Sequence, residues 1–286
     1  MLEARQLRLT LADQAAKRPF RPAPMVTILA GIDLGLDAGE SLGIVGESGS
    51  GKTSLGRTLI RLYRPTGGRL IFEGRDITDL AERELRPLRQ RMQFIFQDPL
   101  SALNPRHRIA TILAKPLIAF GHARSVTAAR LRAGELLERV GLPPALLRRF
   151  PHELSGGQRQ RIGIARAIAL GPRLVVADEI TSGLDVSTQA QILTLLHELR
   201  RDLGLALIFI SHDLSTVRIV CDRVLVLRQG EAVETGPCAE IFAAPKHPYT
   251  RMLLDSIPLP EVDPGWLDRT PAHRVTGAAG RLHQDS

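Results

Sequence analysis

The chain has 286 residues, 44% of them apolar and 24% charged, proportions typical of one large globular domain or of a domain with a subdomain. No apolar run approaches the ~18–20 residues that cross a membrane. The N-terminus carries Glu3 and lacks an apolar core, so we expect no signal peptide. Cys221 and Cys238 are the only cysteines, which excludes a disulfide framework and any four-cysteine metal site. We therefore expect a cytosolic protein, or one bound to a membrane from its cytosolic side.

The net charge of +8 is compatible with a nucleic-acid partner, or with a basic surface that faces anionic lipid. The basic residues are spread along the chain, without a tract of roughly five or more consecutive Lys or Arg. Eight Phe, two Tyr and one Trp leave few rings for stacking on bases. The charge alone therefore selects no partner.

Short apolar runs separated by turns predict alternating strands and helices. In chain order we predict a strand at 2–11, a loop at 13–25, a strand at 28–36, a turn at 37–40, a strand at 42–45, a helix at 54–62, a turn at 65–68, a strand at 70–72, a helix at 79–87 and a strand at 92–96. Further strands at 174–177, 206–210 and 224–227 flank an amphipathic helix at 192–203. This alternation predicts an α/β fold with a mostly parallel sheet.

Strand-like runs are absent between residues 98 and 159. The segment 126–140 has apolar residues at helical spacing, and a Gly-Gly pair precedes a predicted helix at 158–170. We interpret 98–159 as a mostly helical insertion. The last ~30 residues are rich in Pro, Gly and charge, and we expect them to be mobile.

A complete G-x-x-x-x-G-K-[ST] pattern, GESGSGKT, stands between a predicted strand and a predicted helix. Its glycines allow successive backbone N–H groups to point at a polyphosphate, and a helix N-terminus favours the same charge. The alternative is a Gly/Ser-rich turn before an ordinary helix, but an eight-residue match with a strand and a helix on its flanks favours a phosphate site. We predict a nucleoside triphosphate site formed by Gly46, Glu47, Ser48, Gly49, Ser50, Gly51, Lys52 and Thr53, with Lys52 on the β- and γ-phosphates and Thr53 as a Mg²⁺ ligand.

The apolar strand at 174–177 ends in two carboxylates, Asp178 and Glu179. At the carboxyl end of a strand beside the phosphate loop, Asp178 can hold Mg²⁺, and Glu179 can orient and deprotonate a water. Acidic residues are also common at the start of an ordinary helix. The phosphate loop in the same chain favours the functional interpretation.

A third motif, Leu154-Ser155-Gly156-Gly157-Gln158, places a serine and two glycines at a predicted helix start, where a hydroxyl and free N–H groups bind anions. By itself it could be only a helix cap. Gln97 lies upstream and His212 downstream. Together these motifs resemble the ATPase subunits of ABC transporters, from about residue 2 to about residue 258.

The resemblance implies a role for each motif. GESGSGKT is the Walker A loop with Lys52 as a catalytic residue, and Gln97 is the Q-loop glutamine, a catalytic residue and metal ligand. LSGGQ is the signature, whose Ser155, Gly156, Gly157 and Gln158 contact nucleotide, and Glu179 is the catalytic base. Asp185 belongs to the D-loop, and His212 is the switch histidine that contacts the γ-phosphate. The implied cofactors are ATP and Mg²⁺, with Thr53, Gln97 and Asp178 on the metal.

The resemblance also implies an architecture. It predicts a P-loop NTPase (RecA-like) core with an N-terminal antiparallel β part at 1–97 and 160–238, an inserted α-helical subdomain at 98–159, and a C-terminal extension with a flexible tail at 239–286. Two such subunits sandwich two ATP molecules, and the signature of one contacts nucleotide on the other's phosphate loop. The helical insertion contacts two membrane permeases on the cytoplasmic face of the inner membrane. A periplasmic or extracellular binding protein delivers the substrate to these permeases. Nucleic acid is not an expected partner.

The sequence departs from this family pattern at three positions. The aromatic residue that usually stacks on adenine is replaced by Leu11, and the next aromatic is Phe20, so either residue could line the base. Ile180 follows Glu179 where proline is common, and Gly183 stands where alanine is common. Neither change removes a catalytic group.

The tail His247-Pro248-Tyr249-Thr250, followed by Leu253-Leu254, resembles that of ATPases from oligopeptide, dipeptide and nickel importers. We expect a peptide importer whose two ATPases differ, a homodimer being possible, with a nickel or metal-chelate importer as the alternative. Some relatives bind an iron–sulfur cluster after this tail, but no cysteine follows Cys238, so we expect none. A soluble ABC ATPase that acts on nucleic acid, and a regulator that does not hydrolyse ATP, are the more distant alternatives.

Overall fold

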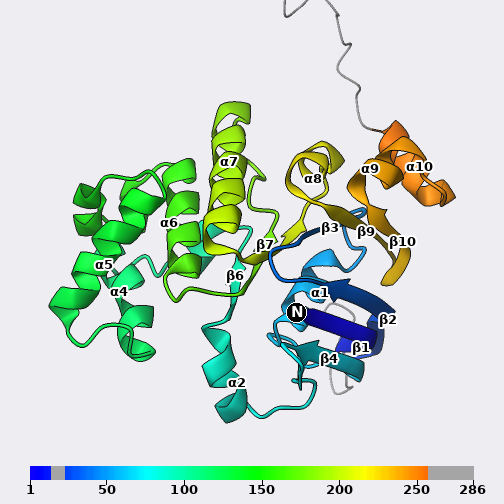
Figure 1. Cartoon of the computed structure of the whole chain (residues 1–286), viewed down its shortest axis with the longest axis horizontal. Coiled ribbons are helices and arrows are strands. Elements are labelled where there is room, and N and C mark those ends of the chain that lie inside the picture. The colour runs from blue at the N-terminus through cyan, green and yellow to red at the C-terminus, as the bar shows by residue number, and fades with distance from the viewer. Residues whose placement is uncertain (14–22, 257–286) are drawn as a thin grey trace, which may run out of the picture.

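The apolar strands of the sequence assemble into a central six-stranded sheet in the order β10-β9-β3-β8-β7-β6, in a computed structural model that describes residues 1–13 and 23–256 (Figure 1). Only β10 runs antiparallel to its neighbour, so the sheet is mostly parallel, as predicted. Its strands are β3 (Ser41–Val45), β6 (Met92–Ile95), β7 (Leu174–Asp178), β8 (Ala206–Ile210), β9 (Arg223–Arg228) and β10 (Glu231–Pro237). Every residue of β3, β7 and β8 is buried, which explains their continuous apolar sequences.

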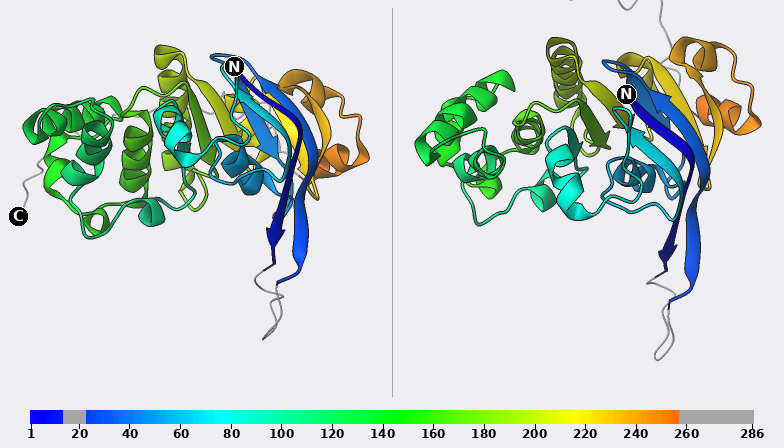
Figure 2. Two further views of the ribbon diagram at one scale, coloured as in Figure 1. Left: turned by 90° about the horizontal axis from the view of Figure 1, so that it is seen from below. Right: turned by 60° about the horizontal axis from the view of Figure 1, so that its bottom comes forward.

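A second, antiparallel sheet has the order β2-β1-β4-β5. It consists of β1 (Leu2–Ala12), β2 (Met25–Leu36), β4 (Gly67–Phe72) and β5 (Arg75–Asp76). Figure 2 shows β1 and β2 as a long ribbon that extends beyond the central sheet. The apolar face of this second sheet packs with helix α1 against one face of the central sheet, through residues such as Leu7, Leu29, Leu55 and Ile44.

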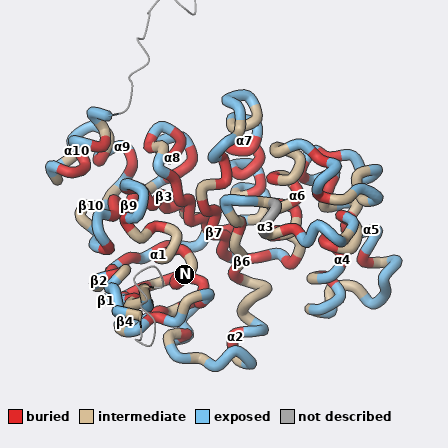
Figure 3. Tube along the Cα trace, turned by 180° about the vertical axis from the view of Figure 1, so that it is seen from behind, coloured by how far each residue is buried: buried red, intermediate tan, exposed pale blue. Residues whose placement is uncertain are grey.

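The helices cover the remaining surfaces. They are α1 (Lys52–Leu59), α2 (Glu82–Arg89), α3 (Pro99–Ala102), α4 (Ile109–Ala119), α5 (Val126–Arg139), α6 (Gly156–Ile168), α7 (Val186–Leu203), α8 (Leu214–Val220), α9 (Cys238–Ala243) and α10 (Pro248–Asp255), with 3₁₀ turns at Pro144–Arg148 and Pro151–Glu153. Residues of α6, α7 and α8 pack on the other face of the central sheet. Figure 3 shows that buried residues concentrate in the central strands between these layers.

The segment 98–159 is described throughout and contains helices and 3₁₀ turns but no strand, as predicted. Helix α4 packs against α5 and α6, so this group of helices lies beside the central sheet (Figure 1). A separate small cluster of apolar residues, which includes Leu117 and Ala129, joins α4 to α5.

Several predicted boundaries were wrong. Helix α1 runs from Lys52 to Leu59 and not over 54–62, because Arg61 adopts a φ of 58° and its guanidinium donates to two carbonyls of the loop after β5, those of Ile77 and Leu80. Helix α2 continues past Pro87 to Arg89, since a helix that begins at Glu82 loses only one internal hydrogen bond at this proline. Strand β2 begins three residues earlier than predicted.

The sequence also left several elements unpredicted, namely β5, β10, α8 and α9. Strand β10 is mostly exposed or half-buried and contains Gly236 and Pro237, so its sequence lacks an apolar run. Helices α8 and α9 are short, with too few turns for a helical period to emerge. The tail predicted to be mobile, beyond residue 256, lies outside the described residues.

Candidate functional site

The phosphate-loop motif lies between β3 and α1, and its glycines have the backbone conformations that the pattern requires. Gly46, Gly49 and Gly51 all have positive φ angles, of 152°, 82° and 102°. A Cβ atom on Gly46 would lie 2.1 Å from the carbonyl oxygen of Leu227, so no side chain fits there. The loop is thus a backbone cradle at the N-terminus of α1, of the kind that binds polyphosphate.

Lys52 is buried in this loop, and its ammonium group donates to the carbonyl oxygens of Gly46 at 2.8 Å and Glu47 at 2.7 Å. Burial lowers the pKa of Lys52, while the carboxylates of Glu179, Asp178 and Glu47 act in the opposite direction. An ammonium has three donors. Two of them hold the loop, and the third can bind a phosphate oxygen.

Thr53 and Asp178 meet directly beneath the loop, where the Thr53 hydroxyl donates to Asp178 Oδ1 at 3.0 Å. Burial raises the pKa of Asp178, and the hydrogen bond from Thr53 opposes that shift. A hydroxyl and one carboxylate are the protein donors that Mg²⁺ commonly takes beside substrate phosphates. The described residues hold no group of three or more His, Cys, Asp or Glu that could bind a metal alone. The donor set therefore fits a metal that is shared with nucleotide phosphates.

Glu179 is held by two side chains that come from neighbouring strands. Gln97, which follows β6, donates its Nε2 to Glu179 Oε2 at 2.9 Å, and Nδ1 of His212, which follows β8, lies 3.5 Å from the same oxygen. Glu179 itself follows β7 and has a φ of 45°, which is unusual for a residue with a side chain. Since β6, β7 and β8 are parallel neighbours, their carboxyl ends bring these three residues together at one edge of the sheet.

The signature residues form a second group, at the start of α6. The Ser155 hydroxyl accepts from Gln158 N at 3.3 Å, and Gln158 Oε1 accepts from Ser155 N at 3.0 Å. This reciprocal cap starts the helix at Gly156, whereas the sequence had predicted a start at Gln158. A Cβ atom on Gly157 would lie 2.6 Å from Thr188 Cγ2. The described contacts of these residues are thus with one another and with the start of α7.

Asp185 caps that neighbouring helix. Its carboxylate accepts from Thr188 N at 2.9 Å and from the Thr188 hydroxyl at 2.7 Å, and the backbone hydrogen bond is the main reason that its pKa is lowered. A cavity of about 340 Å³ separates the Gln97 segment from the signature helix, and Gly156, Gly183 and Leu184 contribute to its walls. The sequence did not predict this capping role, which an Asp three residues before a Thr could have indicated.

Sequence reasoning also missed Tyr249. The ring of this residue is buried in α10. Its hydroxyl, however, accepts a hydrogen bond of 3.0 Å from the backbone N–H of Glu47, inside the phosphate loop. The two residues are 202 positions apart, and no spacing in the sequence indicates the contact.

Comparisons with known proteins agree with this geometry. Residues 29–182 match the family model described as ABC transporter, and residues 233–282 match that of the oligopeptide/dipeptide transporter C-terminal region. The oligopeptide transport ATP-binding protein OppF of Escherichia coli is 44% identical over 92% of this chain and 79% of its own length. The chain belongs to the ABC transporter ATPase family.

Further proteins of known sequence or structure are similar to this ABC ATPase. AppF of Bacillus subtilis, also named an oligopeptide transport ATP-binding protein, is 48% identical over 82% of the chain and 71% of its own length. Among solved structures, the dimeric cassette MJ0796 in a post-hydrolysis state with ADP and Pi has a TM-score of 0.73 and 30% identity, covering 83% of this chain and 99% of that one. The predicted fold class is therefore confirmed.

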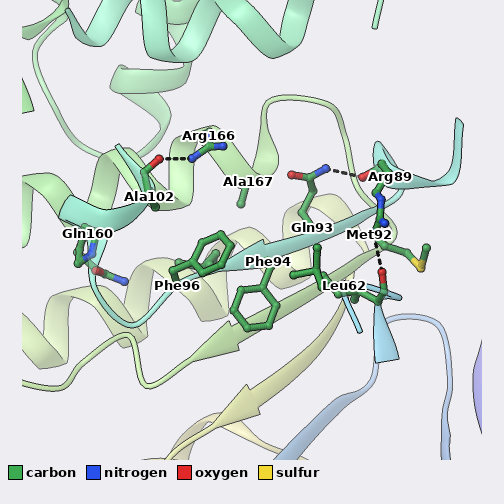
Figure 4. Close-up of a pocket in the computed structure, with 14 residues that line it drawn as sticks. Leu62, Arg89, Met92, Gln93, Phe94, Phe96, Ala102, Gln160, Arg166 and Ala167 are labelled. Atoms are coloured by element: carbon green, nitrogen blue, oxygen red, sulfur yellow. Dashed lines mark hydrogen bonds between the residues drawn. The ribbon is translucent and has the colours of Figure 1, made fainter. Parts of the chain in front are cut away.

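The ABC ATPase also carries a largely apolar groove of about 170 Å³ on its surface (Figure 4). Phe94 and Phe96 line it, with ring centroids 4.8 Å apart, and α6 contributes Gly163 and Ala167. Leu62 lies at its other end and is 43% exposed. Strand β6, which carries Phe94, leads directly to Gln97 in the catalytic cluster.

Leu11 and Phe20 were the two residues predicted to line the adenine base. Leu11 lies near the end of β1, half-buried and packed against the core beneath the antiparallel sheet, while Phe20 lies outside the described residues.

In the part of the chain that the structure describes, no helix is long and apolar enough to span a bilayer.

Proposed function

We propose that this chain is the ATP-hydrolysing subunit of a bacterial importer for di- or oligopeptides. The observation that carries the catalytic part is the arrangement of Gln97 and His212 on the carboxylate of Glu179, at the sheet edge that also holds the phosphate loop. The match of the C-terminal region and the names of the relatives support a peptide cargo. A nickel or metal-chelate cargo is the alternative, because an energy subunit of this kind does not itself bind the cargo.

In this proposal the backbone N–H groups of the phosphate loop and the ammonium of Lys52 bind the β- and γ-phosphates of ATP. Thr53, Asp178 and Gln97 would hold Mg²⁺, and the amide of Gln97 can do so through its oxygen while its nitrogen stays on Glu179. When bound, Mg²⁺ supplies charge neutralisation on the phosphate oxygens. These residues fix the polyphosphate before any bond breaks.

Glu179 would act as the general base. Its carboxylate is oriented by Gln97 and His212, and it would accept a proton from a water aimed at the γ-phosphorus. His212 is largely exposed, at 61%, so its ring can reach the γ-phosphate from the end of β8. Charge stabilisation by Lys52 and His212 would lower the barrier in the usual manner of phosphoryl transfer.

The signature residues at the start of α6 would act in a dimer of two ATPases. Ser155, Gly156, Gly157 and Gln158 would contact nucleotide held by a sister ATPase, together with Asp185. Closure of two subunits on ATP and their release after hydrolysis would drive two permeases as a rigid-body switch. We propose a heterodimer at the cytoplasmic face of the inner membrane, supplied by a substrate-binding protein outside it.

The apolar groove beside Phe94 and Phe96 is the proposed permease contact. The helical insertion at 98–159 borders this groove, and strand β6, which lines the groove, leads to Gln97. Movement of Gln97 in the catalytic cluster would therefore reach a permease segment bound in the groove. The proposed domains are an ATPase core at 1–97 and 160–238 and a C-terminal extension at 239–286.

The test reconstitutes the chain in liposomes with candidate sister ATPase, permease and binding-protein subunits from the same genome. We expect ATPase activity that a peptide-loaded binding protein stimulates and that Glu179→Gln reduces by at least roughly a hundredfold, while Mg-ATP binding is retained. Stimulation only by a nickel chelate would replace the cargo and keep the mechanism. Activity insensitive to Glu179→Gln would overturn the catalytic assignment.

A further inference from the structure

The peptide group between Gly46 and Glu47 is held at both of its polar ends. Its carbonyl oxygen, on Gly46, accepts from the Lys52 ammonium at 2.8 Å, and its N–H, on Glu47, donates to the Tyr249 hydroxyl at 3.0 Å. A peptide unit is planar, so two such bonds fix the orientation of this part of the loop. One partner is the phosphate-binding lysine, and the other belongs to the C-terminal helix α10.

Tyr249 is itself held firmly, so its hydroxyl has a defined position. The ring is buried, at 4% exposure, and the guanidinium of Arg228 lies 5.0 Å from its centroid. The backbone N–H of Tyr249 donates to His247 Nδ1 at 3.1 Å, which caps α10. The strand that carries Arg228 also places the Leu227 carbonyl against Gly46, so one strand end supports both the loop and the tyrosine.

The segment that leads into α10 is fixed to the central sheet. The carboxylate of Glu234, in β10, accepts from Lys246 N at 2.8 Å and from His247 N at 3.1 Å. Helix α10 therefore begins at a set position relative to β10 (Figure 1). A continuous series of contacts joins β10, Glu234, His247 and Tyr249 to the phosphate loop.

We propose that Tyr249 is a positioning residue for ATP binding, which holds the first peptide of the phosphate loop in its phosphate-binding orientation. The inference rests on the proposed function, because it assigns a further residue to the same site. Once its third donor binds phosphate, the Lys52 ammonium is shared among the nucleotide and the carbonyls of Gly46 and Glu47. Tyr249 then keeps the peptide plane from turning, so the loop does not lose order as the nucleotide binds.

The test is Tyr249→Phe, which removes the hydroxyl and keeps the ring beneath Arg228. The dissociation constant for Mg-ATP is measured in a Glu179→Gln background, and KM and kcat are measured in the otherwise native chain. We expect the dissociation constant and KM to rise roughly three- to tenfold, as for a lost internal hydrogen bond, with kcat changed less than about twofold. Amide hydrogen exchange at Glu47, followed by NMR, should accelerate.

Tyr63→Phe is the matched control, since it removes the hydroxyl of the other tyrosine, which accepts from Arg57 Nη1 at 3.0 Å. We expect it to leave the nucleotide affinity and the exchange of the Glu47 amide unchanged. Unchanged affinity and exchange in Tyr249→Phe, or a lower Tm with normal affinity, would overturn this inference alone. A parent chain that binds no ATP would overturn the proposed function and the inference together.

Discussion

At Gly46 the loop has no space for a side chain, and the conflict is with backbone. The carbonyl oxygen of Leu227 would lie 2.1 Å from an added Cβ, and the φ of 152° is a conformation that other residues rarely adopt. Gly49 and Gly51 have more space. An added Cβ atom on Gly49 would meet nothing within 4 Å, and one on Gly51 would lie 3.1 Å from the carbonyl oxygen of Ile28. Steric exclusion in the loop is thus concentrated at its first residue.

We expect Gly46→Ala to lose Mg-ATP binding and to destabilise the fold by roughly 1–3 kcal/mol, the cost of a strained backbone position. Nucleotide titration and thermal unfolding measure the two effects. Gly134→Ala, in α5, is the control, because an added Cβ would lie 3.8 Å from its nearest neighbour, Leu147 Cδ1, and alanine is about 1 kcal/mol more favourable than glycine inside a helix. Wild-type nucleotide affinity in Gly46→Ala would contradict the steric argument.

Residue types explain why some of this site could be predicted and some could not. Lys52, Thr53, Asp178 and Glu179 stand in patterns of adjacent residues, where local chemistry requires each type, and the structure brings their strands and loop together. Tyr249 stands in the tail motif at 247–250, but that motif does not indicate a contact with the phosphate loop. Its hydroxyl meets a backbone N–H, which every residue except proline offers, so the sequence carries no complementary signal.

At the scale of elements, the starts of α6 and α7 pack as a pair. Gly157 of the signature allows Thr188 to approach, and Thr188 in turn holds the Asp185 cap through its backbone and its hydroxyl. A change in one helix start is thus transmitted to the other. The sequence predicted one helix after the Gly-Gly pair and the other from the apolar periodicity of 192–203. It did not predict this contact, because glycine and threonine are common at helix starts for purely local reasons.

The pair of variants Gly157→Ala and Gly157→Ala/Thr188→Ser separates packing from nucleotide contact. We expect Gly157→Ala to lower the Tm and the ATPase activity, since its Cβ would lie 2.6 Å from Thr188 Cγ2. Serine removes that methyl group and keeps the hydroxyl on Asp185. If Gly157 also contacts nucleotide, the double variant regains the Tm but not the activity.

If the double variant recovered both the Tm and the ATPase activity, Gly157 would not contact nucleotide, and its role would be to allow the packing of α6 against α7. Thr188→Ser alone is the control, and we expect it to preserve the Tm and the activity. Thermal unfolding and steady-state ATPase assays with the partner subunits give both quantities for each variant.

At the scale of the whole molecule, the mostly parallel sheet connects three separate regions. The carboxyl ends of β6, β7 and β8 gather the catalytic side chains, β9 and β10 carry the C-terminal helices to the phosphate loop, and β6 also forms the wall of the apolar groove. The groove thus runs along β6, and the catalytic cluster begins just beyond the carboxyl end of the same strand. A partner that binds the groove would act on Gln97 without a long path through the protein.

Gly163→Leu tests that connection by filling the groove from α6. An added Cβ at Gly163 meets nothing within 4 Å, and leucine is a good helix former, so we expect normal Tm and Mg-ATP affinity. Because the side chain occupies space that a permease segment would take, we expect co-purification with permeases and transport-coupled ATPase activity to be lost. Gly163→Ala, which adds only a methyl group, should retain most of both. Normal co-purification of Gly163→Leu would place the permease contact elsewhere on the surface, and the route from the groove through β6 to Gln97 would then carry no signal.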